Sequence, residues 1–516
     1  MARYYITVSI PYVNARPHVG YALELVQADV LARLHRNEGD EVRFLGGTDD
    51  HALKNVLAAE QAGVSAAELV AENGGRFFDL GDQLETSFDD FIRTSSDPRH
   101  APGVERLWRQ TAANGDFYRK WYEGHYCLGC EQFYADADLV AGSCPEHHTA
   151  VEWVAEENWF FRLSRYTDQL IEVISSDRLL IAPAAYRSEV LSFLSSGLSD
   201  ISVSRSRQRA RGWGIGVPDD PEQVVYVWWD ALANYVTALD YGAGSVCSEA
   251  PAYEKWWAGA DERIHVIGKG IVRFHAVYWP ALLLSAGLPL PTRIYVHPYL
   301  TVDGQKISKS AANGADPASL VSSYGSDALR WWLLHDVPRG SDADFTVDRL
   351  VACANEDLAN GLGNLASRVA AMVKRFRAGG EAGGASSGGA SGGEAGASLA
   401  RDVTDLERVV RSYVDDFDFR SATLAVNSVV AGLNQYIEAT RPWELARAGS
   451  AGELAGVLGF LLGAVRHVAE VAVPLIPSGA GRVLSLLTAA IGNTGLLAPA
   501  FPRLEMEAAG VLPPSH

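Results

Sequence analysis

Cysteine is scarce in this sequence, with five among 516 residues, and no segment has the pattern of an export signal. The first residues, MARYYITVSIPY, lack the positive region and long apolar core of a signal peptide. The most apolar late stretch, LAGVLGFLLGAV, falls well short of the roughly 20 residues that a membrane helix needs. These absences predict a reduced, cytoplasmic protein that does not enter a membrane.

Positive charge is also in short supply, since 44 Lys and Arg stand against 63 Asp and Glu, a net charge of −19. Nucleic-acid binding depends on local patches rather than on the net value, so the acidic balance does not exclude it. Two basic runs occur, RSRQRAR (205–211) and VKRFR (373–377), and each alone is more typical of a solvated face than of an RNA contact. The 48% hydrophobic content predicts a globular chain. The length of 516 residues predicts about three domains.

The first 50 residues predict a strand, a helix and a second strand. RYYITVSI (3–10) is rich in β-branched and aromatic residues, as buried strands are. Residues 19–39 carry apolar positions at helical spacing and end in Gly39, and EVRFLGGTDD (41–50) is again strand-like. This order is the unit of a doubly wound parallel sheet, in which ligands bind beyond the carboxyl ends of the strands.

Later parts of the chain have other patterns. Residues 116–215 break the alternation and look inserted, and strand-like segments such as VVYVWWDAL and RIHVIGKGI follow them. From about residue 350 the pattern is helical, with no convincing strand. A Gly/Ala/Ser-rich segment within this helical region predicts a disordered loop between two helices.

Two short motifs are suited to binding phosphate. In PYVNARPHVGY (11–21), His18 and Gly20 stand at the start of the expected helix, where free N–H groups and positive potential favour an anion. In KISKS (306–310), two lysines and two serines can surround a triphosphate and stabilise the leaving pyrophosphate. Alone, each motif is weak, because a capping loop or a solvated Lys/Ser loop has the same composition. A G-x-x-x-x-G-K-[ST] loop does not occur.

Three of the five cysteines crowd into a short segment that predicts a zinc knuckle. CLGC is followed after thirteen residues by CPEHH, which gives Cys127, Cys130, Cys144 and His147, with His148 as an alternative to His147. Two pairs with two-residue spacers suit tetrahedral zinc. Because all four ligands come from the protein, we expect a structural ion and not a catalytic one.

Together, the phosphate motifs resemble the two signatures of class I aminoacyl-tRNA synthetases, His-Ile-Gly-His and Lys-Met-Ser-Lys-Ser. They stand here as HVGY (18–21) and KISKS (306–310). The zinc knuckle within an insertion is similar to that of the methionyl enzymes. The resemblance covers about residues 4–500. It implies an α/β fold: a Rossmann-type doubly wound parallel sheet split by a zinc-binding insertion, then an all-α helical-bundle anticodon-binding domain.

The resemblance also implies the domain boundaries. The expected parts are the first half of the Rossmann catalytic domain at 1–115, the insertion at 116–215, the second half at 216–325, a stem-contact region at 326–350, and the anticodon domain at 351–516 with a disordered loop at 378–399.

A methionine pocket follows from the same resemblance. A thioether is polarizable and favours aromatic neighbours, while a buried ammonium group needs a carboxylate, here Asp49. The residues at the matching positions are Ile10, Tyr12, Asp49, Trp228, Tyr235, Ile271, Phe274 and His275.

For the nucleotide, the resemblance implies a set of residues around ATP and its Mg²⁺, with catalysis assigned to His18, Tyr21, Lys306 and Lys309. The ATP-binding residues that it implies are His18, Gly20, Tyr21, Glu24, Arg205, Lys269, Lys306, Ser308 and Lys309. Two positions depart from the family pattern: Tyr21 replaces the second signature His, and Gly270 replaces the usual Asp after Lys269. We expect an active enzyme whose nucleotide binding is retuned.

The implied reaction is attack of the methionine carboxylate on the α-phosphate of ATP, followed by transfer of methionine to the terminal ribose of tRNA(Met). Asn364, Arg368 and Trp443 match family positions that read the anticodon, in the way single-stranded RNA is generally read. A monomer is expected. Three rival interpretations remain: a leucine, isoleucine or valine synthetase, a paralogue that activates an amino acid without tRNA, and a non-catalytic RNA-binding protein.

Overall fold

The computed structural model describes residues 1–127, 132–134, 136–145, 149–242, 251–302, 304–306, 316–377, 393–492 and 498–505. The chain divides into two compact units. The first, called here the catalytic unit, comprises Met1–Asp82 and Thr86–His297. The second, the C-terminal unit, comprises Gln83–Glu85 and Pro298–His516.

A six-stranded sheet forms the centre of the catalytic unit, and every neighbouring pair in it is parallel. Its strands, in spatial order, are β3 (Asp90–Arg93), β2 (Glu41–Thr48), β1 (Arg3–Val8), β12 (Glu262–Gly268), β13 (Arg293–His297) and β7 (Leu180–Ala182). From β1, the strands β2 and β3 are added in sequence order on one side. On the other side, β7 comes first in the chain and forms the far edge, and β12 and β13 then fill the space between β1 and β7. The predicted parallel sheet is confirmed, and its order reverses between β1 and β12, the place where such sheets bind ligands.

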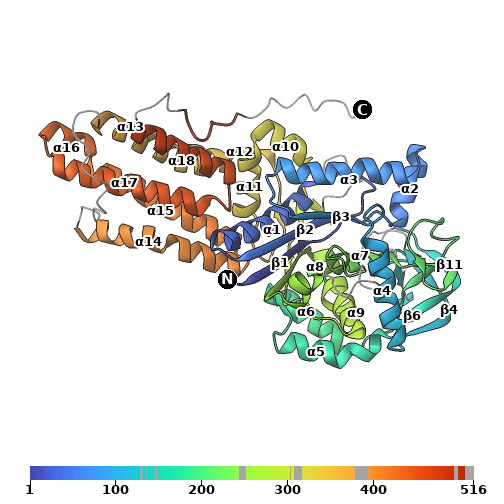
Figure 1. Cartoon of the computed structure of the whole chain (residues 1–516). Helices are drawn as coiled ribbons and strands as arrows, with labels where there is room; N and C mark the ends of the chain where they lie inside the picture. The colour runs from blue at the N-terminus through green and yellow to red at the C-terminus, as the bar shows by residue number, and fades with distance from the viewer. Residues whose placement is uncertain are drawn as a thin grey trace. The chain divides into compact units, whose positions relative to one another are not determined.

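Helices cover this sheet because its strands are apolar on both faces. Helix α1 (Val19–Asn37) packs on β1, β2 and β12 (Figure 1). The other helices of this unit are α2 (Leu53–Ala62), α3 (Ala66–Gln83), α4 (His100–Ala113), α5 (Thr167–Ser175), α6 (Ala184–Ser195), α7 (Val227–Thr237), α8 (Pro251–Tyr253) and α9 (Trp279–Ala286). One buried core joins α4, α7 and α9 to residues of β6 (Glu152–Phe161) and α5.

The expected insertion carries antiparallel structure of its own. One sheet contains β5 (Gln132–Tyr134), β4 (Phe117–Cys127), β6 and β8 (Ile201–Ser202). A second sheet pairs β9 (Ser204–Ser206) of the insertion with β11 (Asp220–Val225), which in turn pairs with β10 (Gly216–Val217); β10 and β11 lie beyond residue 215, in the part expected to begin the second half of the catalytic domain. Strand β7, which also lies within 116–215, pairs with β13 at the edge of the main parallel sheet. The inserted segment therefore supplies the edge strand β7 of the parallel sheet and also forms antiparallel structure outside that sheet.

The C-terminal unit is mainly helical, as expected for this part of the chain. A small sheet of β15 (Gln305–Lys306), β14 (Leu300–Val302) and β16 (Ala343–Asp344) comes first. The helices are α10 (Pro317–Tyr324), α11 (Ser326–His335), α12 (Val347–Cys353), α13 (Asn364–Arg377), α14 (Gly393–Asp415), α15 (Phe419–Thr440), α16 (Pro442–Ala448), α17 (Ala451–Ala472) and α18 (Pro477–Gly492). Helix α14 begins at Gly393, so residues 393–399 are helical, although the disordered loop was expected to reach 399.

Helix α17 is the one helix of the described ranges that is long and apolar enough to cross a membrane. Its apolar window is 44% buried inside the protein, and it packs against α13, α15 and α18. That environment is typical of the central helix of a bundle, and it accounts for the apolar stretch seen in the sequence.

Candidate active site

His18 and Gly20 form the start of α1 at the carboxyl edge of the sheet. His18 is the N-cap, and its Nδ1 accepts a hydrogen bond from the Gly20 backbone N–H at 3.1 Å. A Cβ added at Gly20 would lie 3.0 Å from the His18 ring, so glycine permits this cap. Because Nδ1 accepts, the proton of the neutral ring is on Nε2. His18 can therefore offer an N–H donor beside a helix N-terminus, which suits a phosphate.

Glu24, expected near the nucleotide, is already engaged by the protein. It is 4% exposed. Its Oε1 accepts hydrogen bonds from the backbone N–H and the hydroxyl of Ser9, both at 2.6 Å. Its Oε2 lies 3.0 Å from Nε2 of His297. These contacts tie α1 to the ends of β1 and β13.

Tyr21 is turned into the core. Its side chain is 6% exposed and meets Phe77 edge-on, with ring centroids 5.2 Å apart. Its hydroxyl is buried and has no hydrogen-bond partner among the described residues. Burial, and then the nearby Glu24 carboxylate, raise the pKa of Tyr21 well above its usual value. The structure thus gives the residue that replaces the second signature His a packing role.

Arg205, also expected near ATP, lies inside an aromatic cage. It is 7% exposed, with its guanidinium 4.3 Å from the ring centre of Tyr226, 5.2 Å from that of Phe133 and 5.4 Å from that of Tyr126. Its Nη1 donates to the Ser204 carbonyl at 2.8 Å. Cation–π contacts of this kind stabilise a buried guanidinium, so Arg205 joins β9 to β4, to β5 and to the residue before α7.

The remaining nucleotide residues are placed only in part. Lys269 is half-buried in a helical turn that follows β12. The backbone of Lys306 belongs to β15 in the C-terminal unit, paired with Thr301. The side chain of Lys306, together with Ser308 and Lys309, lies outside the described residues.

The aromatic residues expected to bind methionine come together at the ends of β1, α7 and the turn after β12. Trp228 stacks on Phe274 with ring centroids 3.7 Å apart and an interplanar angle of 11°. Tyr12 lies 6.3 Å from Trp228, centroid to centroid. These rings are half-buried, as are Ile10 and Ile271. Half-buried aromatic faces form a surface that suits a thioether.

Tyr235 and His275 are joined beneath these rings. The Tyr235 hydroxyl lies 2.8 Å from Nε2 of His275, whose Nδ1 is 3.0 Å from the Ile271 carbonyl. A carbonyl can only accept, so Nδ1 carries the proton and the Tyr235 hydroxyl donates to Nε2. Burial lowers the pKa of His275 to about 4, although the Ile271 bond opposes that shift. The imidazole is therefore neutral at physiological pH.

Asp49 follows β2 and is 1% exposed. Its backbone bridges to Tyr12, and its Oδ1 accepts from the backbone N–H of His51 at 3.1 Å. A buried carboxylate beside Tyr12 is the feature that an α-amino group requires. The geometry places the expected ammonium ligand next to the expected aromatic surface.

A buried network that the sequence analysis did not identify supports Asp49. His51 Nδ1 lies 2.6 Å from Asp230 Oδ2, and His100 Nε2 bonds the other oxygen of Asp230. Burial opposes the charge on Asp230, but the two imidazoles hold its pKa well below its usual range. These three side chains could also hold a metal ion. They come from separate segments, and only the closeness of His51 to Asp49, two residues away in the sequence, could have indicated them.

The two described cysteines of the predicted knuckle share one small buried cluster. Cys127 and Cys144 are both fully buried there together with Tyr134. The Cys144 thiol donates a hydrogen bond to the Tyr134 hydroxyl oxygen at 3.7 Å. Burial of two thiols in one cluster fits a metal centre. Cys130 and His147 lie outside the described residues.

The residues expected to read the anticodon all belong to the C-terminal unit. Arg368 on α13 contacts Glu438 on α15, Nη2 to Oε1, at 2.5 Å. The half-buried Trp443 lies in the first turn of α16, which begins at Pro442 shortly after α15 ends. Asn364 is exposed at the start of α13. The structure thus brings Arg368 to the end of α15 that precedes Trp443.

Known proteins match along nearly the whole chain. The family model described as "tRNA synthetases class I (M)" matches residues 4–152 and 147–370, and that of the "Anticodon binding domain of methionyl tRNA ligase" matches 386–495. A methionine–tRNA ligase of Rhizobium meliloti is 39% identical over 97% of this chain and 98% of its own length. One of Brucella melitensis is 39% identical over 94% of this chain and 92% of its own length.

Solved structures agree with these matches. The Mycobacterium tuberculosis methionyl-tRNA synthetase in complex with methionyl-adenylate superimposes with a TM-score of 0.86 at 38% identity, covering 100% of this chain and 99% of that one. The apo form of the same protein gives a TM-score of 0.81 at 35% identity, over 98% of this chain and 99% of that one. From its sheet, its site residues and these relatives, we conclude that the chain belongs to the methionyl class I aminoacyl-tRNA synthetases.

Proposed function

We propose that the chain is a methionine–tRNA ligase, which activates methionine with ATP and transfers it to tRNA(Met). The observation that carries this proposal is the junction of the Trp228–Phe274 stack and Tyr12 with the buried carboxylate of Asp49. The aromatic surface suits the thioether, and the carboxylate suits the ammonium group. Family membership supports the same conclusion.

In the first step, a methionine carboxylate oxygen forms a bond to the α-phosphorus of ATP, and the bond to the β-phosphate oxygen breaks to release pyrophosphate. Mg²⁺ accompanying ATP would neutralise part of the phosphate charge. His18 donates from Nε2 to a phosphate oxygen, and Lys306 and Lys309 stabilise the leaving group. In the second step, the terminal ribose hydroxyl of tRNA attacks the carbonyl carbon, and AMP leaves. Positioning does the work, since no side-chain nucleophile is required.

The proposal includes one structural zinc ion, held by Cys127, Cys130 and Cys144 with His147. Joint burial of the Cys127 and Cys144 thiols supports it. Bound zinc would lock the tip of the insertion, because structural zinc contributes directly to folding.

Anticodon binding by Asn364, Arg368 and Trp443 is also part of the proposal. The exposed amide of Asn364 and the guanidinium of Arg368 on α13 suit base edges, and the half-buried indole of Trp443 on α16 suits base stacking. A monomeric, cytoplasmic enzyme completes it. Analytical sedimentation at micromolar protein concentration would test the monomeric state, and a dimer would contradict it.

Methionine-dependent ATP–pyrophosphate exchange on the purified protein is the deciding experiment, with leucine, isoleucine and valine as controls. We expect exchange with methionine alone, followed by charging of tRNA(Met). Exchange without charging of any tRNA would identify a paralogue that acts on an amino acid alone. Absence of exchange with every amino acid would favour a non-catalytic RNA-binding protein.

A further inference from the structure

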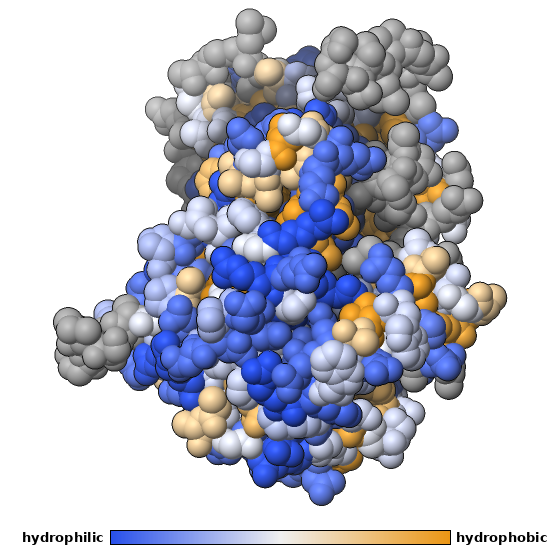
Figure 2. All heavy atoms as spheres, turned by 90° about the vertical axis from the view of Figure 1, so that its right-hand side faces the viewer, coloured by the Kyte–Doolittle hydropathy of each residue, from blue (hydrophilic) through white to orange (hydrophobic). Residues whose placement is uncertain are grey.

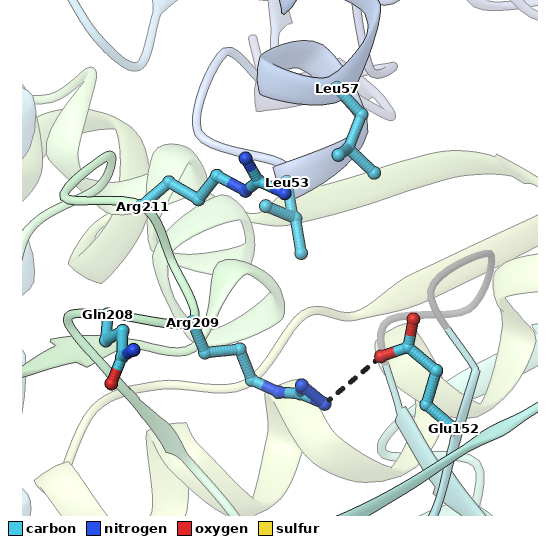
Figure 3. Close-up of a pocket in the computed structure, with 6 residues that line it drawn as sticks. All are labelled: Leu53, Leu57, Glu152, Gln208, Arg209 and Arg211. Atoms are coloured by element: carbon cyan, nitrogen blue, oxygen red, sulfur yellow. Dashed lines mark ion pairs between the residues drawn. The ribbon is translucent and has the colours of Figure 1, made fainter.

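A groove of about 370 Å³ lies in the catalytic unit outside the residues discussed above (Figure 3). Helix α2 contributes Leu53 and Leu57, the turn after β9 contributes Gln208, Arg209 and Arg211, and the first residue of β6 contributes Glu152. Its lining is thus two leucines beside a strongly polar wall. This combination suits a ligand that is both anionic and partly apolar.

The turn that carries the arginines is firmly held. Its backbone closes on itself from Ala210 N–H to the Ser206 carbonyl at 3.0 Å and from Gly212 N–H to the Arg207 carbonyl at 2.9 Å. Trp213 Nε1 donates to the Asp50 carbonyl at 2.8 Å, which anchors the turn beside the end of β2. The groove is therefore largely preformed.

The guanidinium of Arg209 is poised for an anion. Its Nε and Nη2 atoms are buried and make no hydrogen bond within the described part of the chain. The nearest carboxylates are those of Glu152 and Glu156, at 3.8 Å and 3.9 Å, and the Tyr126 ring centre lies 4.5 Å away. Figure 3 shows Arg209 extended toward Glu152 along the groove. A buried donor without a hydrogen bond gains more from an incoming acceptor than a satisfied one does.

Arg211 supplies the second positive group. Its side chain is 52% exposed and is tethered by Nη1 to Glu60 of α2 at 2.6 Å. Arg211 and Leu53 line the same groove (Figure 3). Two guanidiniums along one groove match the repeating charge of a nucleic-acid backbone better than a single small anion does.

The groove adjoins the methionine pocket. Ala52, directly before Leu53, packs in one cluster with Tyr12 and Trp228 of that pocket. The surrounding side of the catalytic unit, which carries α2 and β11, is dominated by hydrophilic side chains (Figure 2). An RNA strand in the groove would thus lie beside the bound amino acid, on a surface suited to a charged partner.

We propose that this groove binds the single-stranded 3′ end of the tRNA, with backbone phosphates at Arg209 and Arg211 and a base against Leu53 and Leu57. Glu152 competes with the phosphate for Arg209. The inference rests on the proposed transfer of methionine to tRNA. It concerns residues that contact tRNA and not those that contact methionine or ATP.

The test compares exchange without tRNA and aminoacylation in three variants. In Arg209→Gln we expect pyrophosphate exchange at the wild-type rate. We expect its kcat/KM for tRNA in aminoacylation to fall by about 10-fold. In Glu152→Gln we expect the KM for tRNA to fall a few-fold, because the competing carboxylate is removed. Arg109→Ala, an exposed arginine of α4, is the matched control and should change neither rate. The wild-type dependence of log KM on log salt should weaken in Arg209→Gln by about 0.7, the value for one single-strand phosphate contact.

Opposite effects of Arg209→Gln and Glu152→Gln cannot arise from damage to the fold, so the pair remains decisive even if one variant is less stable. Unchanged aminoacylation in both variants would overturn the proposal. A raised KM for ATP in exchange would assign the groove to the nucleotide instead and would also overturn it. Wild-type protein without methionine-dependent exchange would instead refute the ligase function itself.

Discussion

The methionine side and the nucleotide side of the catalytic unit both carry residues at positions that match the family, yet the protein uses them differently. On the methionine side the matched side chains meet one another, as Trp228 meets Phe274 and Tyr235 meets His275. On the nucleotide side Glu24 is bonded to Ser9 and His297, and Arg205 lies in its aromatic cage. A matched position therefore fixes where a residue lies, while its contacts decide what it does.

The largest effect should come from Asp49 on the methionine side. In Asp49→Asn the ammonium group of methionine loses its buried counter-charge, which costs about 3 kcal/mol or more. We expect kcat/KM for methionine in pyrophosphate exchange to fall about 100-fold or more. Asp168→Asn, in the exposed first turn of α5, is the control and should retain full exchange. A loss below threefold in Asp49→Asn would remove the ammonium contact from the mechanism.

His275 gives the methionine side a pH dependence of stability. Burial lowers its pKa to about 4, so the native state stays neutral while the unfolded chain, with a pKa of about 6.5, binds a proton. The unfolded state thus binds more protons, and the contribution is fully present above about pH 6.5 and is lost as pH falls toward 4.

The measurement is the urea midpoint of the catalytic unit at pH 7 and pH 4.5. Between these values the wild type should lose about 2 kcal/mol more than His275→Gln, because glutamine does not titrate in this range. Parallel pH curves for the two proteins would mean that His275 titrates normally, and the pocket would be wetter than the structure indicates.

Glu24 tests the nucleotide side of the comparison. Glu24→Gln removes the charge that accepts from Ser9 and faces His297, and we expect a loss of about 2 kcal/mol in unfolding free energy. The KM for ATP should change less than threefold, because the carboxylate is occupied within the protein. A 10-fold rise in the KM for ATP at unchanged stability would contradict this assignment.

The sequence predicted the parallel sheet and the helix start at His18, since each depends on a local pattern. The methionine pocket was implied by the family resemblance; the structure brings its aromatic residues together, and methionine binding there stays a prediction. It could not predict the His51–Asp230–His100 network, because these residues are distant in sequence and meet only through the packing of α4 on α7.

The run at 205–211 is a second case. Its pattern is typical of a solvated face, but the alternation of β9 and the following turn separates its arginines. Arg205 is buried in the cage, Arg209 is mostly buried at the groove, and Arg207 is exposed. Charge spacing alone carries no information on these environments, because the aromatic partners Tyr126 and Phe133 come from another part of the chain.

Substitution of Tyr21 should have the smallest effect on stability, and it tests most directly whether this residue contacts the nucleotide. Its hydroxyl is buried against Phe77 without a hydrogen-bond partner in the described ranges, so Tyr21→Phe removes an uncompensated polar group. We expect the unfolding free energy to rise by about 1 kcal/mol and the KM for ATP to stay within twofold. Tyr21→His, which restores the family residue, should instead lower stability, because burial opposes an imidazole more than a phenol ring. If Tyr21→Phe slowed exchange 10-fold at unchanged stability, the hydroxyl would reach the nucleotide during the reaction, and the two sides of the site would be alike after all.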